Sequence, residues 1–383
     1  MVRNQVKNPF EYWHVVGEES FCNRRKEVAE LLRVMENAGR AFIYGERRLG
    51  KTSFVKLALG KLPVKKFIPV YIDLWPTDSD ASFITTVAKA ITASLSTSLD
   101  KALETAKQFF SHLRPSLTLD EDGKPMLSFG IVKSTRLEPE LEEVLTAPER
   151  IGGKGKTVVI VFDEFQQILM YGRDDIERKL RSIIQHQKNV AYVFMGSRKH
   201  MIREIFLKGS KPLYRSATQF PIGPVNEQDW LPFIQERFHR GKGTISPEQI
   251  HTIIELTQGH PFYTQHLCYH LWELCIANQD VTQGLIHEAL NTLLEKENST
   301  FTVQWESLTL NQQHFLKALA TEERGAKPFS ADFLQRYRLG SASSAQRAIR
   351  SLVDKDIVDQ DNGSFIILDR FFRLWIRRLN AGM

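Results

Sequence analysis

The residues between 44 and 53, YGERRLGKTS, have the composition of a loop that binds phosphate. Gly45, Gly50, Lys51 and Thr52 match the pattern G-x-x-x-x-G-K-[ST] without a gap. In such a loop the glycines let backbone N–H groups converge on phosphate oxygens, the lysine reaches the β- and γ-phosphates, and the threonine hydroxyl binds Mg²⁺. We therefore predict an ATP-binding loop made of Gly45, Arg47, Arg48, Leu49, Gly50, Lys51, Thr52 and Ser53.

A second candidate for phosphate chemistry is the acidic pair Asp163 and Glu164, which follows the apolar run TVVIVF at 157–162. An uninterrupted apolar strand is typical of the middle of a parallel sheet that is covered on both faces. We expect Asp163 to reach the Mg²⁺ shell and Glu164 to act as the general base on the attacking water. The alternative is that Asp163 only caps the following helix. The phosphate loop upstream favours the metal role.

Ser197 and Arg198 follow the next apolar run, VAYVFMG at 190–196. In P-loop ATPases with an extra strand between the phosphate-loop strand and the Asp-bearing strand, this position carries a polar sensor of the γ-phosphate. Arg198 would neutralise charge in the transition state or would be a solvated surface arginine, and the sequence leaves both open. With Lys51 and Glu164, these two residues complete the predicted catalytic group.

The elements around these residues alternate between strands and helices. The predicted phosphate loop follows strand-like RAFIY and precedes KTSFVKLALGKL, whose apolar spacing is that of a helix. The helix dipole then adds its positive end to the phosphate site; a glycine-rich turn without a ligand is the alternative. Five runs have the pattern of strands, at 40–44, 67–74, 157–162, 190–196 and 217–222. This alternation predicts an α/β fold with a parallel five-stranded sheet, the core of a P-loop NTPase.

Several separate stretches resemble the prokaryotic STAND ATPases, signal-transducing P-loop switches related to the AAA+ ATPases. FCNRRKEVAELL at 21–32 is similar to the motif F-x-G-R-x-x-E-L near the start of that family's nucleotide-binding domain. Arg24 and Glu27 match the motif, whereas Asn23 replaces its glycine. The resemblance implies that Arg24 lies near the bound nucleotide.

TQGHPFYTQHLC at 257–268 resembles the G-x-P motif of the same family, with Gly259, His260 and Pro261 in place. In the family this turn belongs to a helical lid, packs near the nucleotide base and reports the nucleotide state. The resemblance therefore implies nucleotide contacts for His260 and Pro261. The stretch also fits an ordinary helix start with a proline in the first turn, and both interpretations can hold together.

The predicted domain organisation has three parts: an ATPase core at 1–222, a helical lid at 223–298 and a winged helix at 299–383. The core contains an insertion at about 113–136, whose alternation of apolar and polar residues around DEDGKP predicts a β-hairpin. Such a hairpin either contacts a partner or substrate or is a flap without a function of its own, and the sequence leaves both open.

In the last part of the chain, three predicted helices are followed by a hairpin with DNG at 361–363 as its wing turn. The third helix has only Arg347 and Arg350 on its polar face, whereas DNA readers usually present more positive charge. The winged helix is therefore expected to contact protein, as the resemblance implies, or DNA. Residues 370–380, RFFRLWIRRLN, interleave aromatic residues with arginines, which fits amphipathic core packing better than nucleic-acid binding.

The bulk composition is that of a globular chain, with 383 residues, 42% hydrophobic content and a net charge of +6. No apolar run approaches the ~18 residues that a membrane span needs, and the N-terminal residues are too polar for a signal peptide. The three cysteines cannot form a paired framework. These features predict a cytoplasmic protein that does not contact a membrane.

The residues and the resemblance together predict a slow, Mg²⁺-dependent ATPase that switches between ATP- and ADP-bound states. A protein partner and a nucleotide-dependent oligomer are implied by the same resemblance. The alternative is a DNA-handling AAA+ ATPase of the replication-initiator or transposition-regulator type, which shares core, lid and winged helix. Those proteins usually carry a lid arginine that acts on the γ-phosphate, and QGHPFYTQH at 258–266 contains none. A nucleotide-binding scaffold without activity is a third hypothesis, against which the intact Glu164 argues.

Overall fold

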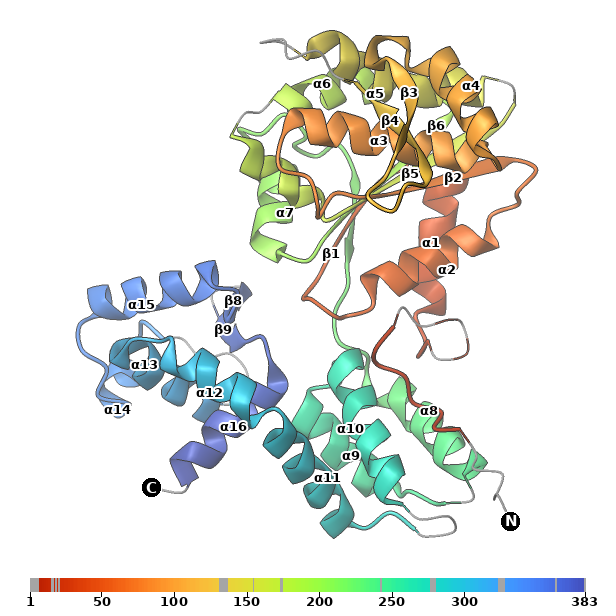
Figure 1. Cartoon of the computed structure of the whole chain (residues 1–383). Helices are drawn as coiled ribbons and strands as arrows, with labels where there is room; N and C mark the ends of the chain where they lie inside the picture. Colours follow the sequence, from red (N-terminus) through yellow and green to blue (C-terminus); the bar gives the residue numbers. More distant parts are fainter. Residues whose placement is uncertain are drawn as a thin grey trace. The chain divides into compact units, whose positions relative to one another are not determined.

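A computed structural model describes residues 7–14, 17, 19, 21–130, 137–153, 155–172, 175–241, 243–275, 280–322, 328–361 and 364–381 (Figure 1). The chain divides into two compact units. The core unit comprises Arg24–Gly223, and the C-terminal unit comprises Pro224–Met383 together with Met1–Asn23. Among the described residues, no helix is both long enough and apolar enough to cross a membrane.

In the described part of the core unit, five parallel strands form one sheet in the order β2-β5-β6-β1-β7. The strands are β2 Phe67–Asp73, β5 Thr157–Asp163, β6 Val190–Gly196, β1 Arg40–Tyr44 and β7 Thr218–Pro221. The predicted α/β fold with a parallel five-stranded sheet is therefore confirmed. Strand β6 lies between β1 and β5, which is the arrangement that the sensor interpretation of Ser197 requires. Because all strands run in the same direction, the residues that follow β1, β5 and β6 meet at one edge of the sheet.

The central strands are buried on both faces because helices cover the sheet (Figure 1). All seven residues of β6 are buried. Aromatic rings stack across neighbouring strands, with ring centroids 5.8 Å apart for Phe162 and Phe194 and 6.4 Å apart for Phe162 and Tyr192. Such pairs stabilise a core by about 0.5–1.5 kcal/mol beyond the burial of their area. The helices in the described part of the core unit are α1 Arg25–Glu36, α2 Lys51–Lys61, α3 Asp80–Leu95, α4 Leu99–Phe109, α5 Glu138–Gly152, α6 Asp175–Ile184 and α7 Lys199–Leu207.

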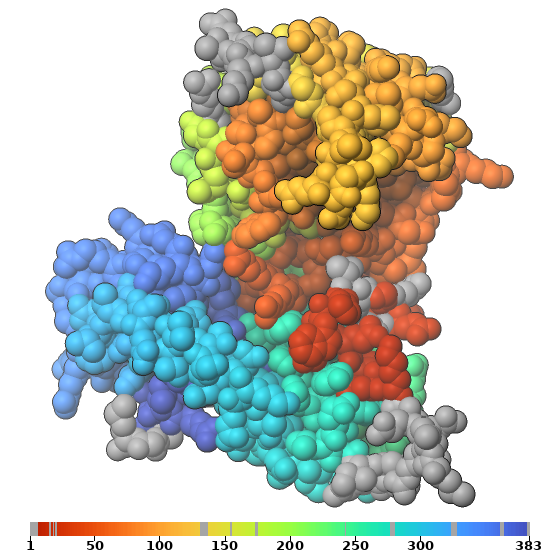
Figure 2. Space-filling model, in the orientation of Figure 1, coloured from red at the N-terminus to blue at the C-terminus, as the bar shows by residue number. Residues whose placement is uncertain are grey.

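The predicted insertion contains an antiparallel hairpin of β3 Pro115–Leu119 and β4 Pro125–Phe129. In its turn, Asp120 Oδ1 accepts hydrogen bonds from the backbone N–H groups of Asp122 and Lys124 at 3.0 and 2.8 Å. Figure 2 shows the hairpin, coloured yellow-orange, on the surface, where Leu117 and Leu119 are exposed. The last residues of the predicted insertion, 131–136, lie outside the described residues.

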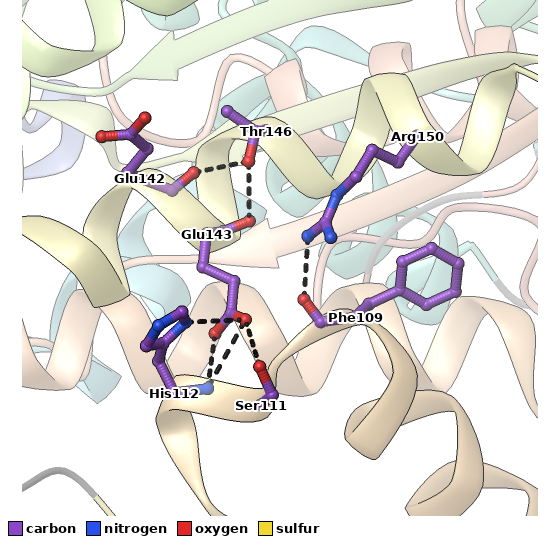
Figure 3. A network of polar contacts seen from close by, with 7 residues as sticks. All are labelled: Phe109, Ser111, His112, Glu142, Glu143, Thr146 and Arg150. Atoms are coloured by element: carbon purple, nitrogen blue, oxygen red, sulfur yellow. Dashed lines mark hydrogen bonds and ion pairs between the residues drawn. The ribbon is translucent and has the colours of Figure 1, made fainter.

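Helix α5 holds the base of this hairpin through a polar network (Figure 3). Glu143 Oε1 accepts hydrogen bonds of 3.1 Å from Ser111 Oγ and His112 Nδ1, and Glu143 Oε2 accepts one of 3.1 Å from His112 N. Arg150 Nη2 donates 2.9 Å to the carbonyl oxygen of Phe109, at the end of α4. The short 3₁₀ turn η2 (Ser111–Leu113) is therefore fixed to α5, and the hairpin begins from a rigid base.

The C-terminal unit is mainly helical and includes the small β8–β9 hairpin. Its elements are α8 Glu227–Arg240, α9 Pro247–Thr257, α10 Pro261–Leu274, α11 Gln283–Lys296, α12 Asn298–Glu306, α13 Leu310–Thr321, α14 Ala331–Arg336, α15 Ala342–Asp354, β8 Val358–Asp361, β9 Ser364–Ile367 and α16 Arg370–Ala381. Strands β8 and β9 pair in antiparallel register as the wing of the predicted winged helix. Two residues of its predicted DNG turn, 362 and 363, lie outside the described residues.

Helices α8, α9, α10 and α11, which make up the predicted lid, share one hydrophobic core with the winged helix. The rings of Tyr263 on α10 and Phe371 on α16 meet edge to face, with centroids 5.0 Å apart. Arg373 Nη2 donates 2.8 Å to the carbonyl oxygen of Glu322, and Arg377 Nε donates to that of Ala320, at the end of α13. Cations favour the C-terminal end of a helix. These arginines therefore take part in packing, as the amphipathic interpretation of residues 370–380 expects.

The N-terminal residues pack on the C-terminal unit, although we expected residues 1–222 to form the core together. The ring of Phe10 lies with its centroid 5.4 Å from that of Phe238 on α8. Asn8 Nδ2 donates 3.1 Å to the carbonyl oxygen of Tyr269, and Cys22 Sγ lies 3.5 Å from that of Asp229. The described N-terminal stretch is thus held by contacts to residues more than 200 positions away, and the chain passes between the units at Asn23–Arg24 and at Gly223–Pro224.

Candidate active site

The predicted phosphate loop connects β1 to α2 and curves through left-handed backbone conformations. Gly50, directly before α2, has φ 81°, and Arg48 has φ 62°. A Cβ on Gly45 would lie 2.3 Å from the carbonyl oxygen of Ile222, so this position has no room for a side chain. The backbone N–H of Ile222 donates a hydrogen bond of 2.8 Å to the carbonyl oxygen of Tyr44. This bond holds Ile222, and with it the Ile222 carbonyl, against the loop. The close approach explains why Gly45 must be glycine.

Lys51 is the first residue of α2, and its side chain is buried. Its Nζ donates 3.0 Å to the carbonyl oxygen of Gly45 and 2.6 Å to that of Glu46, so the ammonium reaches back across the loop. Burial lowers the pKa of Lys51 to about 8, and the neighbouring carboxylates of Glu164, Asp163 and Glu46 partly oppose this shift. A buried ammonium of this kind favours an anion as its partner.

The other predicted loop residues differ in exposure. Arg47 and Arg48 are exposed, whereas Leu49 and Ser53 are buried. The guanidinium of Arg47 lies 5.8 Å from the ring centre of Trp75, which follows β2. Leu49 and Ser53 are therefore covered by neighbouring residues, whereas the side chains of the two arginines reach solvent.

Asp163 ends β5 and lies beside the phosphate loop. Its Oδ2 accepts hydrogen bonds from Thr52 Oγ1 at 3.3 Å and from the hydroxyl of Tyr71, and its Oδ1 accepts one of 2.9 Å from the backbone N–H of Glu164. Burial raises the pKa of Asp163, and the bond from Tyr71 opposes that change. The sequence predicted that Thr52 and Asp163 bind the same metal ion. It did not predict the contact of Tyr71, because no motif marks this residue of β2.

Glu164 follows with φ 52°, a left-handed conformation that is uncommon for a residue with a side chain. Its Oε2 accepts a hydrogen bond of 2.8 Å from Ser197 Oγ and another from Gln166 Nε2. A Cβ on Gly196 would lie 2.5 Å from Gln166 Oε1, so the buried amide occupies the space beside that glycine. Gln166 is a second residue that sequence reasoning missed, because nothing in FQQIL distinguishes it from Gln167.

Arg198 precedes α7 and is half-buried. Its Nη1 lies 3.8 Å from Met201 Sδ. Both interpretations of this arginine stay open, and its role as a sensor remains a prediction.

Arg24 and Asn23 stand where the core unit begins, and both have left-handed backbones, with φ 66° and 56°. Asparagine tolerates this conformation better than most residues, which explains how Asn23 replaces the glycine of the resembled motif. The buried Arg24 donates through Nη2 to the carbonyl oxygen of Gly223. This bond joins the two ends of the core unit, and the proposed nucleotide contact of Arg24 stays a prediction.

His260 and Pro261 start α10 in the C-terminal unit, with Pro261 as the first helical residue. His260 is buried, and its ring centroid lies 4.7 Å from that of Tyr263. Gly259 has φ 65°, and a Cβ there would lie 2.5 Å from Val225 O. The G-x-P stretch thus serves as a helix start, and the nucleotide contacts of His260 and Pro261 stay predictions.

The residues at the sheet edge fit a magnesium ion. Thr52 Oγ1 and the Asp163 carboxylate lie side by side and offer the hard oxygen ligands that Mg²⁺ prefers. Among the described residues, no group of three or more His, Cys, Asp or Glu side chains forms a cage for a metal. One or two protein oxygens completed by phosphate and water are typical of Mg²⁺ sites in nucleotide-binding proteins.

Two family profiles match the chain. One, described as an ATPase domain predominantly from Archaea, matches residues 21–267, and the other, described as a probable winged helix domain, matches residues 299–378. Among proteins with curated descriptions, none matches the chain.

Solved structures share the fold. A Walker-type ATPase of Pyrococcus abyssi is 16% identical with a TM-score of 0.62, covering 94% of this chain and 97% of that one. The ORC2 protein of Aeropyrum pernix, solved as ADPNP–ADP complexes, is 14% identical with a TM-score of 0.51, covering 94% and 96%. These identities support a common fold and nothing finer. The ATPase profile spans more than half of the chain. This protein therefore belongs to the family of ATPase domains found predominantly in Archaea.

Proposed function

We propose that the chain binds ATP with Mg²⁺ and hydrolyses it slowly at the sheet edge of the core unit. The observation that carries this proposal is the convergence of four side chains from three separate stretches. Thr52 meets Asp163 at 3.3 Å, and Ser197 meets Glu164 at 2.8 Å. These four side chains carry the hydroxyl and carboxylate groups that metal binding, water activation and contact with the γ-phosphate require.

Each residue has a distinct role in this proposal. Lys51 neutralises the β- and γ-phosphates, and Thr52 and Asp163 hold the metal. A bound Mg²⁺ would withdraw charge from the phosphate oxygens. Glu164 orients the attacking water and accepts its proton, while Ser197 donates a hydrogen bond to the γ-phosphate.

Calorimetric titration with ATP and Mg²⁺ tests the binding half of the proposal. Lys51→Ala removes the cation that faces the phosphates and is expected to weaken ATP binding strongly. Lys61→Ala, at the exposed far end of the same helix, is the matched control and should bind as the wild type does. Equal ATP affinity in the wild type and Lys51→Ala would reject the site.

We further propose that the ATPase is a switch of the STAND type. Its two units are joined by two chain crossings, and one of them follows the Ile222 carbonyl that abuts Gly45 in the phosphate loop. The lid helices and winged helix share a core, so they would respond together. A nucleotide shifts such an equilibrium only if its affinities for the two arrangements differ.

Small-angle scattering with ADP and with a non-hydrolysable ATP analogue tests the switch. The proposal expects different profiles for the two ligands and loss of that difference in Arg198→Ala. Identical profiles in the wild type would leave an ATPase without a switch.

A DNA-handling ATPase is the second candidate because Arg347 and Arg350 on α15 are both exposed. Fluorescence anisotropy with a labelled DNA duplex over a salt series tests it. The candidate expects binding that weakens with salt, and a slope reduced by about one to two in Arg347→Ala/Arg350→Ala. Turnover with and without the duplex, together with native mass, would report coupling and oligomeric state. Absence of binding at low salt would exclude this candidate.

A further inference from the structure

Tyr71 lies in β2, the neighbour of the strand that ends in Asp163. The register pairs Asp73 with Asp163 and Tyr71 with Val161. The tyrosine side chain nevertheless reaches the end of the adjacent strand, where its hydroxyl donates to Asp163 Oδ2. Lys56 from α2 covers the ring, with its Nζ 5.3 Å from the ring centre. The phenol is therefore held between the phosphate-loop helix and the acidic strand.

Two hydroxyl groups converge on the same oxygen of Asp163. Thr52 Oγ1 donates to Oδ2 at 3.3 Å, and the Tyr71 hydroxyl donates to that same atom. The other oxygen, Oδ1, accepts a bond of 2.9 Å from Glu164 N. The rotation of the carboxylate is thus fixed from both sides by neighbours of the predicted metal site.

A second buried tyrosine in the same sheet provides a comparison. Tyr192 in β6 donates 2.6 Å to Gln187 Oε1, a neutral amide outside the predicted catalytic group. Both phenol groups donate a hydrogen bond, but only Tyr71 donates to the predicted metal ligand, Asp163. A purely structural account of the hydroxyl would predict similar consequences for its removal at either position.

We propose that Tyr71 is a positioning residue for the magnesium site, whose hydroxyl orients the Asp163 carboxylate so that Asp163 and Thr52 serve one cation. This inference rests on the proposed Mg²⁺-dependent nucleotide binding. Groups that hydrogen-bond metal-ligating carboxylates fix their orientation, and their loss typically costs about 10–100-fold in metal affinity. Tyr71 would therefore act on the metal through Asp163 and not by touching the nucleotide.

The test is a Mg²⁺ titration of nucleotide binding, measured with a fluorescent ADP in wild type, Tyr71→Phe and Tyr192→Phe. Tyr71→Phe keeps the ring beneath Lys56 and removes only the hydroxyl. We expect about tenfold weaker apparent Mg²⁺ affinity in Tyr71→Phe, with unchanged ADP affinity in the presence of EDTA. Tyr192→Phe should match the wild type in both measurements.

A double-variant cycle separates positioning from a general loss of structure. Once Asp163→Asn has removed the metal ligand, adding Tyr71→Phe should cause no further loss of Mg²⁺ affinity. Equal and additive losses in the two backgrounds would overturn the inference, as would a Tyr71→Phe variant with wild-type Mg²⁺ dependence. A Tyr71→Phe variant that loses ADP binding even in EDTA, or that fails to fold, would also overturn it.

The wild-type titration distinguishes failure of this inference from failure of the proposed function. If wild-type ADP binding is independent of Mg²⁺, the metal-binding part of the proposed function fails before Tyr71 is considered. If ADP binding by the wild type depends on Mg²⁺ and Tyr71→Phe shows the same dependence, only the role of Tyr71 is rejected.

Discussion

Ser197 Oγ donates a hydrogen bond of 2.8 Å to Glu164 Oε2. In the proposed function the same hydroxyl contacts the γ-phosphate, and the same carboxylate activates the water. A γ-phosphate would therefore compete with the Glu164 carboxylate for the hydrogen bond that the Ser197 hydroxyl donates. In the proposed function this competition would link the presence of ATP to the state of the general base, whereas ADP lacks the group that competes.

Replacement of Ser197 tests this link. We expect Ser197→Ala to bind ADP as the wild type does and to bind an ATP analogue about tenfold more weakly, because one hydrogen bond to a charged group is lost. Competition binding with the two nucleotides measures the ratio. Ser182→Ala, which removes a serine hydroxyl on α6 that donates to Lys179 O, is the control. An unchanged ATP-to-ADP ratio in Ser197→Ala would contradict the sensor role.

The pH dependence of nucleotide binding follows from the buried Lys51. Burial lowers its pKa from 10.5 to about 8 in the nucleotide-free protein, and phosphate favours the protonated form. Below pH 8 the ammonium is already charged, but above pH 8 binding must take up a proton. Affinity should therefore fall as pH rises above 8, by at most about tenfold per unit. Calorimetry between pH 7 and 10 should find this fall of nucleotide affinity in the wild type. If Lys51→Ala shows the same fall, a group other than Lys51 causes the pH dependence.

Gly196 is expected to be intolerant of a side chain. In Gly196→Ala the new Cβ would lie 2.5 Å from Gln166 Oε1 and 3.1 Å from Ile202 Cβ. Displacement of Gln166 removes one of the two side-chain donors to Glu164, so turnover should fall more than ATP affinity. Crowding of a packed core typically lowers the free energy of unfolding by about 1–3 kcal/mol.

Denaturant unfolding and steady-state turnover measure the two effects of Gly196→Ala. Gly209→Ala is the control, because a Cβ at Gly209 meets nothing within 4 Å. A Gly196→Ala variant with wild-type turnover would show that the position of Gln166 is unimportant for hydrolysis.

Loss of Glu143 should loosen the hairpin and leave the nucleotide site intact. Glu143→Ala leaves the exposed Ser111 and His112 donors to water, which should raise amide exchange through β3 and β4 and cost about 0.5–1.5 kcal/mol. Hydrogen exchange by mass spectrometry measures the effect. Glu142→Ala, which breaks only the 2.6 Å ion pair with Lys179, is the adjacent control and should cost under ~1 kcal/mol. Equal protection of the hairpin in both variants would contradict the anchoring role.

Much of the candidate site could be predicted from the sequence because its determinants are local. The phosphate loop and the apolar run before Asp163 are contiguous, and each gives its own structural signal. Once parallel strands are inferred, the carboxyl ends of β1, β5 and β6 must lie at one edge, so the meeting of Ser197 with Glu164 follows from topology.

The remaining contacts depend on side-chain directions and long-range packing that no pattern encodes. Tyr71 reaches Asp163 only because of the register between β2 and β5, and Gln166 reaches Glu164 only because Gly196 leaves space. The association of Phe10 with Phe238 joins residues more than 200 positions apart. A short apolar stretch near the N-terminus does not specify which distant helix will cover it.

The central claim is that Glu164 is the general base of an ATP-hydrolysing site, and Glu164→Gln tests it most directly. The amide keeps the size of the side chain but cannot accept a proton from water. Calorimetry should find ATP affinity close to that of the wild type, while phosphate release falls by about 10²–10⁴-fold. Glu121→Gln, at the exposed hairpin turn, controls for the change of charge. Wild-type turnover in Glu164→Gln, or absence of turnover in the wild type with ATP bound, would contradict the claim.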